Sequence, residues 1–176
     1  MINILKSILK GISFIDRVNE YFAKTAAWLF FPVILIMSYE VLRRKGFNNS
    51  TIWSHEMSYF LCSLMLMFGM AYVLKIKGHI SIDILYGRIN SKGKAILDIF
   101  SFIVFFVPLW FFGLKLMSYY LIKSYVFQER DYWGCWFPLL WPLKAWTFLG
   151  AILLVLQGFA EFIRDIICLI KGGERP

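Results

Sequence analysis

The chain offers few residues with redox, metal-binding or acid–base chemistry. Its only histidines are His55 and His79, and on one helix the 24 positions that separate them would span roughly 36 Å, too far to share a haem or a metal ion. The three cysteines, Cys62, Cys135 and Cys168, form no CxxC pair and have no metal-ligand spacing. The sequence therefore predicts no redox motif, no disulfide framework and no bound cofactor.

Nucleotide and nucleophile motifs are also missing from the sequence. The segment from Ser91 to Ala95 approaches a phosphate-binding loop, but the Walker pattern needs a glycine five positions before Gly93 and Ser or Thr after Lys94. Arg88 and Ala95 occupy those two positions. A Ser/His/Asp or Cys/His assembly would need residues from opposite ends of long apolar runs. We therefore predict that the chain is not an enzyme.

Ionisable residues inside an apolar run would mark a transport path, yet nearly every charge stands near the end of a run. The candidate helical pairs are Glu40 with Arg43 or Arg44, and Glu161 with Arg164. Lys115 is the exception, because it stands inside an apolar run. Its long side chain reaches the outer face of the membrane if the residue lies close enough to that face. The sequence predicts no ion or substrate path within this chain.

The elements that must position these residues are membrane helices. Of 176 residues, 60% are hydrophobic, 19% aromatic and only 17% charged, whereas a soluble domain is about a quarter charged. So much apolar surface cannot be buried inside one small core, which excludes a soluble enzyme and a disordered tail. The net charge of +8 comes from basic residues between apolar runs, which is typical of membrane anchors rather than of a nucleic-acid surface.

Four apolar runs reach the roughly 20 residues that a bilayer-spanning helix needs, and backbone groups in lipid must bond internally. The sequence predicts an all-α integral membrane protein, one four-helix domain over residues 1–176, with transmembrane helices near residues 25–42, 57–74, 97–118 and 145–165. Lys and Arg near the run ends number 12 on the side of both termini and 7 on the other. Both termini are therefore expected in the cytoplasm.

Residues 1–24 are predicted to form an N-terminal amphipathic interfacial helix. One face would carry Leu5, Ile8, Ile12, Ile15 and Phe22, and the opposite face Lys6, Lys10, Arg17 and Lys24. Such a helix lies in the membrane interface with its apolar face toward lipid. A frayed polar tail is the alternative.

The connection before the last run is rich in tryptophan. Residues 131–146 hold four of the seven Trp, at positions Trp133, Trp136, Trp141 and Trp146, together with Pro138 and Pro142. Because indole rings favour the headgroup level and prolines discourage a regular helix, we expect a short irregular segment at the outer interface. It is either an ordinary aromatic belt or a surface for a permanent protein partner.

Short elements follow one another in a defined order from Tyr39 to Asp83. They are Arg44, Phe47-Asn48, Trp53 and Glu56, then Gly69-Met70-Ala71, then Lys75 and His79-Ile80-Ser81-Ile82-Asp83; Trp141-Pro142-Leu143-Lys144 and Leu153 to Gln157 come later. In order and spacing they resemble the small membrane subunit (DctQ-like) of tripartite ATP-independent periplasmic (TRAP) transporters. Lys45 departs from the aromatic that is usual after Arg44, and Trp146-Thr147 stands where a proline often opens the fourth span.

The resemblance implies an accessory role. In that family a periplasmic substrate-binding protein delivers a solute, usually an organic acid, to a large permease subunit that carries the Na⁺ and substrate sites. The small subunit is a scaffold beside it in the bacterial inner membrane. On this basis we expect structural or subunit-interface roles for eight residues: Arg44, Trp53, Glu56, Lys75, His79, Asp83, Trp141 and Lys144.

Two other functions stay open at this point. One is a free-standing four-helix drug or cation exporter, in which Glu40 would carry the proton, although Glu40 lies within three residues of Arg43. The other is a quinone-binding subunit of a membrane enzyme, which would share the aromatic richness but normally needs the haem ligands that this chain lacks.

Overall fold

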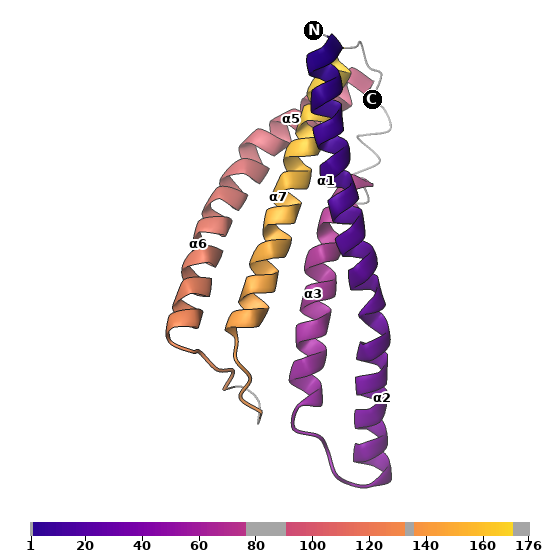
Figure 1. The fold of residues 1–176 in the computed structure, drawn as a ribbon, viewed down its shortest axis with the longest axis vertical. Coiled ribbons are helices and arrows are strands. Elements are labelled where there is room, and N and C mark those ends of the chain that lie inside the picture. Colours follow the sequence, from indigo (N-terminus) through magenta and orange to yellow (C-terminus); the bar gives the residue numbers. More distant parts are fainter. Residues whose placement is uncertain (1, 77–90, 133–135, 171–176) are drawn as a thin grey trace.

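A computed structural model describes residues 2–76, 91–132 and 136–170, where all regular structure is helical apart from one β-bridge between Arg130 and Leu139. The helices are α1 (Ile2–Trp28), α2 (Phe30–Gly46), α3 (Ser54–Lys75), α5 (Ser91–Ser101), the π-helix η1 (Phe102–Phe106), α6 (Val107–Val126) and α7 (Trp141–Ile170). They form an elongated bundle (Figure 1). We call the end with the α2–α3 and α6–α7 connections the loop end, and the opposite end, where α1 begins, the terminal end.

Three helical stretches of the described chain are long and apolar enough to cross a bilayer: Leu9–Gly46, Ser54–Lys75 and Gly93–Val126. They contain the first three predicted spans, which confirms the all-helical membrane class. The fourth predicted span, residues 145–165, lies within α7, which is not one of the three. The count of four therefore stays a prediction.

The N-terminal helix is longer than predicted and leads directly into the first span. α1 ends at Trp28 and α2 begins at Phe30, continuing in the same general direction (Figure 1). Pro32 explains the break, because it has no N–H to donate to the carbonyl of Trp28. The N–H of Leu29 instead bonds to the carbonyl of Ala26 at 3.0 Å. The interfacial position of this helix stays a prediction.

α7 lies at the centre of the bundle, where it packs against α1, α3, α5, η1 and α6. It has eleven buried residues, whereas α2 has none and α6 has only Ser124. The approach to α3 is close at Gly150, where an added Cβ would lie 2.8 Å from the Cβ of Met67. Most of the surface of α2 and α6 is therefore left for lipid or another subunit.

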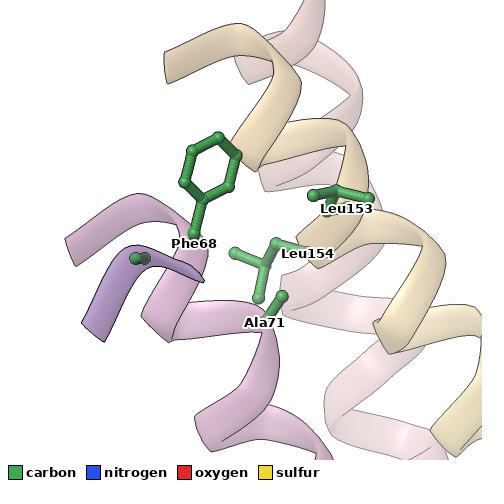
Figure 2. Packing of buried hydrophobic residues seen from close by; sticks show 5 residues of the cluster. Phe68, Ala71, Leu153 and Leu154 are labelled. Atoms are coloured by element: carbon green, nitrogen blue, oxygen red, sulfur yellow. The ribbon is translucent and has the colours of Figure 1, made fainter. Parts of the chain in front are cut away.

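The apolar core lies where α1, α3 and α7 meet. Phe68 and Ala71 of α3 face Leu153 and Leu154 of α7 (Figure 2), and Ala26 of α1 completes the cluster. Because lipid is as apolar as these side chains, this small cluster holds the helices together by close van der Waals packing and not by exclusion of water. Polar contacts between helices supply further links.

The third predicted span is one bent helix. α5 passes into α6 through η1, where the N–H of Val107 bonds to the carbonyl of Phe102 five residues back. Pro108 follows and supplies no N–H. Phe102 stacks on Phe106 with ring centroids 4.9 Å apart and on Phe162 of α7 at 4.6 Å. A π-turn beside a proline is a recognised cause of bending, and Figure 1 shows α5 inclined to α6.

The prediction of an irregular segment over residues 131–146 is wrong for residues 141–146. α7 begins at Trp141, and Pro142 falls in its first turn, where a missing N–H costs nothing. Before it, residues 129–131 pair with residues 138–140 in an antiparallel arrangement. The N–H of Asp131 bonds to the carbonyl of Pro138 at 2.9 Å, and the N–H of Leu140 bonds to the carbonyl of Glu129 at 3.0 Å.

Candidate functional site

The predicted interface residues within the described ranges stand at helix ends. Arg44, Trp53 and Glu56 flank the α2–α3 loop, Trp141 and Lys144 begin α7, and Lys75 ends α3. His79 and Asp83 lie outside the described residues. The structure thus groups five of the eight residues at the loop end and places Lys75 apart from them. Their roles as interface residues stay predictions.

The Phe47-Asn48 element ends α2. Asn48 has φ of 51°, a left-handed conformation that asparagine tolerates better than most residues. The N–H groups of Phe47 and Asn49 both bond to the carbonyl of Arg43, at 3.1 and 3.2 Å. This arrangement satisfies a carbonyl that the end of the helix would leave unpaired, and it turns the chain toward α3.

Glu40 fixes the α2–α3 loop. Its Oε2 accepts the N–H of Thr51 at 2.9 Å, the hydroxyl of Ser54 at 3.0 Å and the hydroxyl of Thr51. The predicted pairing of Glu40 with Arg43 or Arg44 is therefore wrong. The reason is that the loop brings three donors onto the carboxylate, while the side chain of Arg44 is exposed.

Trp53 and Glu56 begin α3. The ring of Trp53 stacks on Tyr39 of α2 with centroids 6.4 Å apart, beside the Glu40 contacts. Glu56 is only 7% exposed, and its Oε2 has no hydrogen-bond partner within the described structure. A buried carboxylate oxygen without a donor is unfavourable, so Glu56 is the least satisfied of the predicted interface residues.

Trp141 and Lys144 fasten the start of α7 to the neighbouring elements. The ring of Trp141 meets Tyr125 of α6 edge-on at 5.6 Å. The Nζ of Lys144 lies 2.5 Å from the Oε2 of Glu129, and the two side chains are 28% and 44% exposed. This hydrogen bond from Lys144 holds the pKa of the Glu129 carboxyl below its ordinary value.

Acid is expected to loosen this contact. Because the pKa of Glu129 is lowered in the folded chain, the pair stabilises the fold fully above the ordinary carboxyl pKa of about 4.3. That contribution is lost as the pH falls through the lower, folded-state pKa. Since both side chains are partly exposed, it amounts to less than about 1 kcal/mol. The melting temperatures of the wild type and Glu129→Gln in detergent should differ at pH 7 and converge as the pH falls below the ordinary carboxyl pKa; a constant difference would contradict this assignment.

Lys75 contacts α1, a partner that the sequence did not indicate. Its Nζ lies 2.9 Å from Oε2 of Glu20, whose Oε1 is 2.7 Å from the Nζ of Lys24. Glu20 therefore stands between two lysines. The contact ties the middle of α1 to the end of α3.

A larger polar contact joins α1 to α7. Asn19 and Gln157 are fully buried, and the Nδ2 of Asn19 donates to Oε1 of Gln157 at 2.6 Å. The Nε2 of Gln157 donates to Oδ1 of Asp16 at 3.0 Å and to Oε1 of Glu161 at 3.3 Å. Arg164 donates to both carboxylates. We call these five residues the polar seam.

The polar seam was predicted only in part. The Glu161–Arg164 pair is confirmed, but the contact of Arg164 with Asp16 was missed. A signal for it exists in the sequence, because Asp16 and Asn19 interrupt the apolar face on which Ile12 and Phe22 stand. Polar residues on an otherwise apolar helix face need a partner inside the fold.

These contacts define the class of protein. Within the described ranges, no group of three or more His, Cys, Asp or Glu side chains is placed to hold a metal ion, and His55 is exposed. Apart from Glu56, whose Oε2 has no partner in the described structure, most of the polar side chains described above bond to a neighbouring helix or loop. They fasten the helices of a multi-span membrane protein to one another.

The family model for tripartite ATP-independent periplasmic transporters, DctQ component, matches residues 33–168. The match covers well over half of the chain, so the chain belongs to this family and is a small component of a TRAP transporter. The resemblance inferred from the sequence elements is thereby confirmed, and the family is one of transporter components rather than enzymes. No curated protein and no solved structure matches the chain.

Proposed function

We propose that this chain is the accessory subunit that scaffolds the large permease subunit during Na⁺-coupled, binding-protein-dependent uptake of an organic acid or related solute. Membership of the DctQ family carries the proposal. The uncovered apolar surfaces support it, because α2 buries no residue and α6 buries only Ser124. In lipid these faces can pack closely against helices of a partner, and such packing is what drives membrane helices to associate.

The scaffold is proposed to lie in the bacterial inner membrane with both termini in the cytoplasm. The bias of basic residues toward the terminal end supports this orientation. α7 serves as the fourth crossing, since its 30 residues extend about 45 Å and exceed the thickness of the hydrocarbon core. Four crossings return the chain to the side on which it began.

The interhelical polar contacts suit a scaffold. A fixed subunit beside a moving one must keep its helices at constant angles, and contacts at both ends of the bundle restrict tilting. Glu40 and Lys144 restrain the loop end, while Lys75 and the polar seam restrain the middle and the terminal end. Arg44, Trp53, Glu56 and Trp141 are left to meet the large subunit or the binding protein at the loop end.

A free-standing drug or cation exporter is not favoured. A proton carrier must exchange protons with water and substrate from a cavity, whereas Glu40 accepts three hydrogen bonds from Thr51 and Ser54 at the end of α2. Those donors stabilise its charged form. The residue that the exporter hypothesis needs therefore has a structural task.

Co-purification tests the proposed function directly. The tagged chain is expressed with its neighbouring genes, and the proteins that remain bound in mild detergent are identified. A stable pair with a large multi-span permease is expected, and the pair together with its binding protein should restore solute uptake in proteoliposomes. Drug export by the chain alone, with no bound permease, would overturn the proposal.

Glu56→Gln is expected to separate the fold of the chain from its assembly. The exchange removes a buried charge whose Oε2 has no donor in the described structure, so the melting temperature of the isolated chain should stay equal or rise. Its yield of co-purified permease should fall several-fold if a donor of the large subunit meets this oxygen. Glu40→Gln is the matched control, because it should lower the stability of the isolated chain itself. An intact complex with Glu56→Gln would remove this residue from the interface.

A further inference from the structure

The apolar face of α1 is already occupied by the bundle. Ile12 and Ala26 are buried, and the ring of Phe22 packs on Phe68 of α3 with centroids 5.2 Å apart. Asn19 on the same face joins the polar seam. The face that the sequence assigns to lipid is therefore not available to it, and any contact of α1 with the membrane must use the opposite side.

That opposite side carries a regular row of cations and aromatic rings, which we call the α1 stripe: Lys10, Phe14, Arg17, Tyr21, Lys24 and Trp28. The steps alternate between four and three residues and average 3.6, so the six side chains follow one line along the helix for about 27 Å. Phe14, Tyr21 and Trp28 are 66%, 69% and 71% exposed. All three cations are exposed as well.

The α1 stripe has an excess of positive charge. Asp16 turns inward to Arg164, whereas Glu20 is partly exposed and lies between Lys75 and Lys24, so it offsets the charge of Lys24 alone within the stripe. Neither Lys10 nor Arg17 forms an ion pair with another residue in the described part of the chain. Two exposed cations therefore remain between exposed aromatic rings.

The chemistry of this surface changes at the α1–α2 junction. Beyond Trp28 the same spacing continues through Phe31 and Leu35, which are exposed and wholly apolar. The rings of Trp28 and Phe31 lie 5.5 Å apart, so the two surfaces are continuous. A passage from apolar side chains to aromatic and basic ones is what a membrane protein presents from the hydrocarbon core to the headgroups.

We propose that the α1 stripe binds anionic phospholipid headgroups of the cytoplasmic leaflet. The cations meet the phosphates while the rings of Phe14, Tyr21 and Trp28 lie among the headgroups. Because the stripe is much longer than the headgroup layer is thick and α1 continues in the general direction of α2 (Figure 1), the proposal requires both helices to be inclined to the membrane normal. This inference depends on the proposed function in one respect only, namely that the orientation proposed there places α1 on the cytoplasmic side of the membrane.

Native mass spectrometry of the purified complex with the large permease tests this lipid contact. The complex is offered equal amounts of phosphatidylglycerol and phosphatidylcholine, and the ratio of the two bound lipids is measured. The double variant Lys10→Gln/Arg17→Gln should lower the preference for phosphatidylglycerol by about fivefold for each cation removed. Lys115→Gln/Lys123→Gln on α6 removes two exposed cations from another helix and should leave the ratio within twofold of the wild type.

A second measurement does not depend on those variants. A spin label on Tyr21→Cys, in a chain whose own cysteines are replaced by serine, should lie at headgroup depth in bilayers that contain phosphatidylglycerol. A label that is as accessible to water as one at Gln128 would overturn the proposal. So would equal lipid ratios for all three proteins, or loss of the permease from the Lys10/Arg17 variant with lipid binding unchanged. Loss of the permease from every protein would instead count against the proposed function.

Discussion

Replacing Arg164 with methionine is expected to destabilise the isolated chain by about 3–5 kcal/mol. Arg164 is the basic member of the polar seam and donates to the carboxylates of both Asp16 and Glu161. Without it, the carboxylates of Asp16 and Glu161 would both lose this cation next to Gln157, between α1 and α7. Removing one partner of a buried ion pair costs more than removing the whole pair, because the remaining charge stays desolvated.

The measurement is thermal unfolding of the detergent-purified chain, where a loss of this size lowers the melting temperature by roughly 6–20 °C. The triple variant Asp16→Asn/Glu161→Gln/Arg164→Met is the matched control. It removes the same cation together with the charges that the cation neutralised, so it should recover much of the lost stability. An unchanged melting temperature in Arg164→Met alone would mean that the polar seam does not hold α1 to α7.

Gly150→Ala is expected to cost about 1–3 kcal/mol through overpacking. The added Cβ would lie 2.8 Å from the Cβ of Met67 and 3.3 Å from its backbone carbonyl carbon. Because a backbone atom cannot swing aside, α3 and α7 must move apart, and their shared core with Phe68 and Leu154 loosens.

Gly69→Ala provides the comparison for that exchange. Gly69 lies on α3 and has no atom within 4 Å of an added Cβ, so the same substitution should stabilise the helix by up to about 1 kcal/mol. The melting temperatures and the yields of monodisperse protein should therefore change in opposite directions for the two variants. A stabilised Gly150→Ala would show that the helices are not in contact at this position in solution.

Local spacing predicted some contacts of this fold and failed for others. Glu161 and Arg164 stand three residues apart on one helix, and they pair as their spacing indicates. Glu40 has equally suitable basic neighbours, but the loop places the N–H of Thr51 on its carboxylate. Helical spacing decides a pair only where no other element brings competing donors.

Contacts between distant parts of the chain could not be predicted. Asp16 and Arg164 are 148 positions apart, and Lys75 and Glu20 are 55 apart. Which of them meet depends on how α1 rotates against α3 and α7, and composition does not determine that rotation. The sequence located the hydrophobic face of α1 but not the elements that pack against it. It predicted that this face contacts lipid, whereas Phe68 and other residues of the bundle cover it.

The membrane class and the family could be predicted because the features that indicate them are visible in the sequence itself. Long apolar runs allow only helices in lipid, and the ordered elements from Arg44 to Asp83 are matched by the family assignment over residues 33–168. The bounds of the helices were less predictable. Pro142 was taken to disfavour a regular helix, yet it lies in the first turn of α7, the one place where proline suits a helix.

The absence of any buried residue in α2 has a mechanical consequence. This helix packs on α3 and has half-buried residues such as Val33 and Ile36, and it is fastened at its ends by the Glu40 contacts with Thr51 and Ser54 and by its junction with α1. Because no side chain of α2 is fully buried, the medium beside α2 has a strong influence on its tilt. In bilayers of different thickness, α2 should change its inclination readily while the deeply packed α7 keeps its own. One chain then combines a compliant edge with a rigid centre.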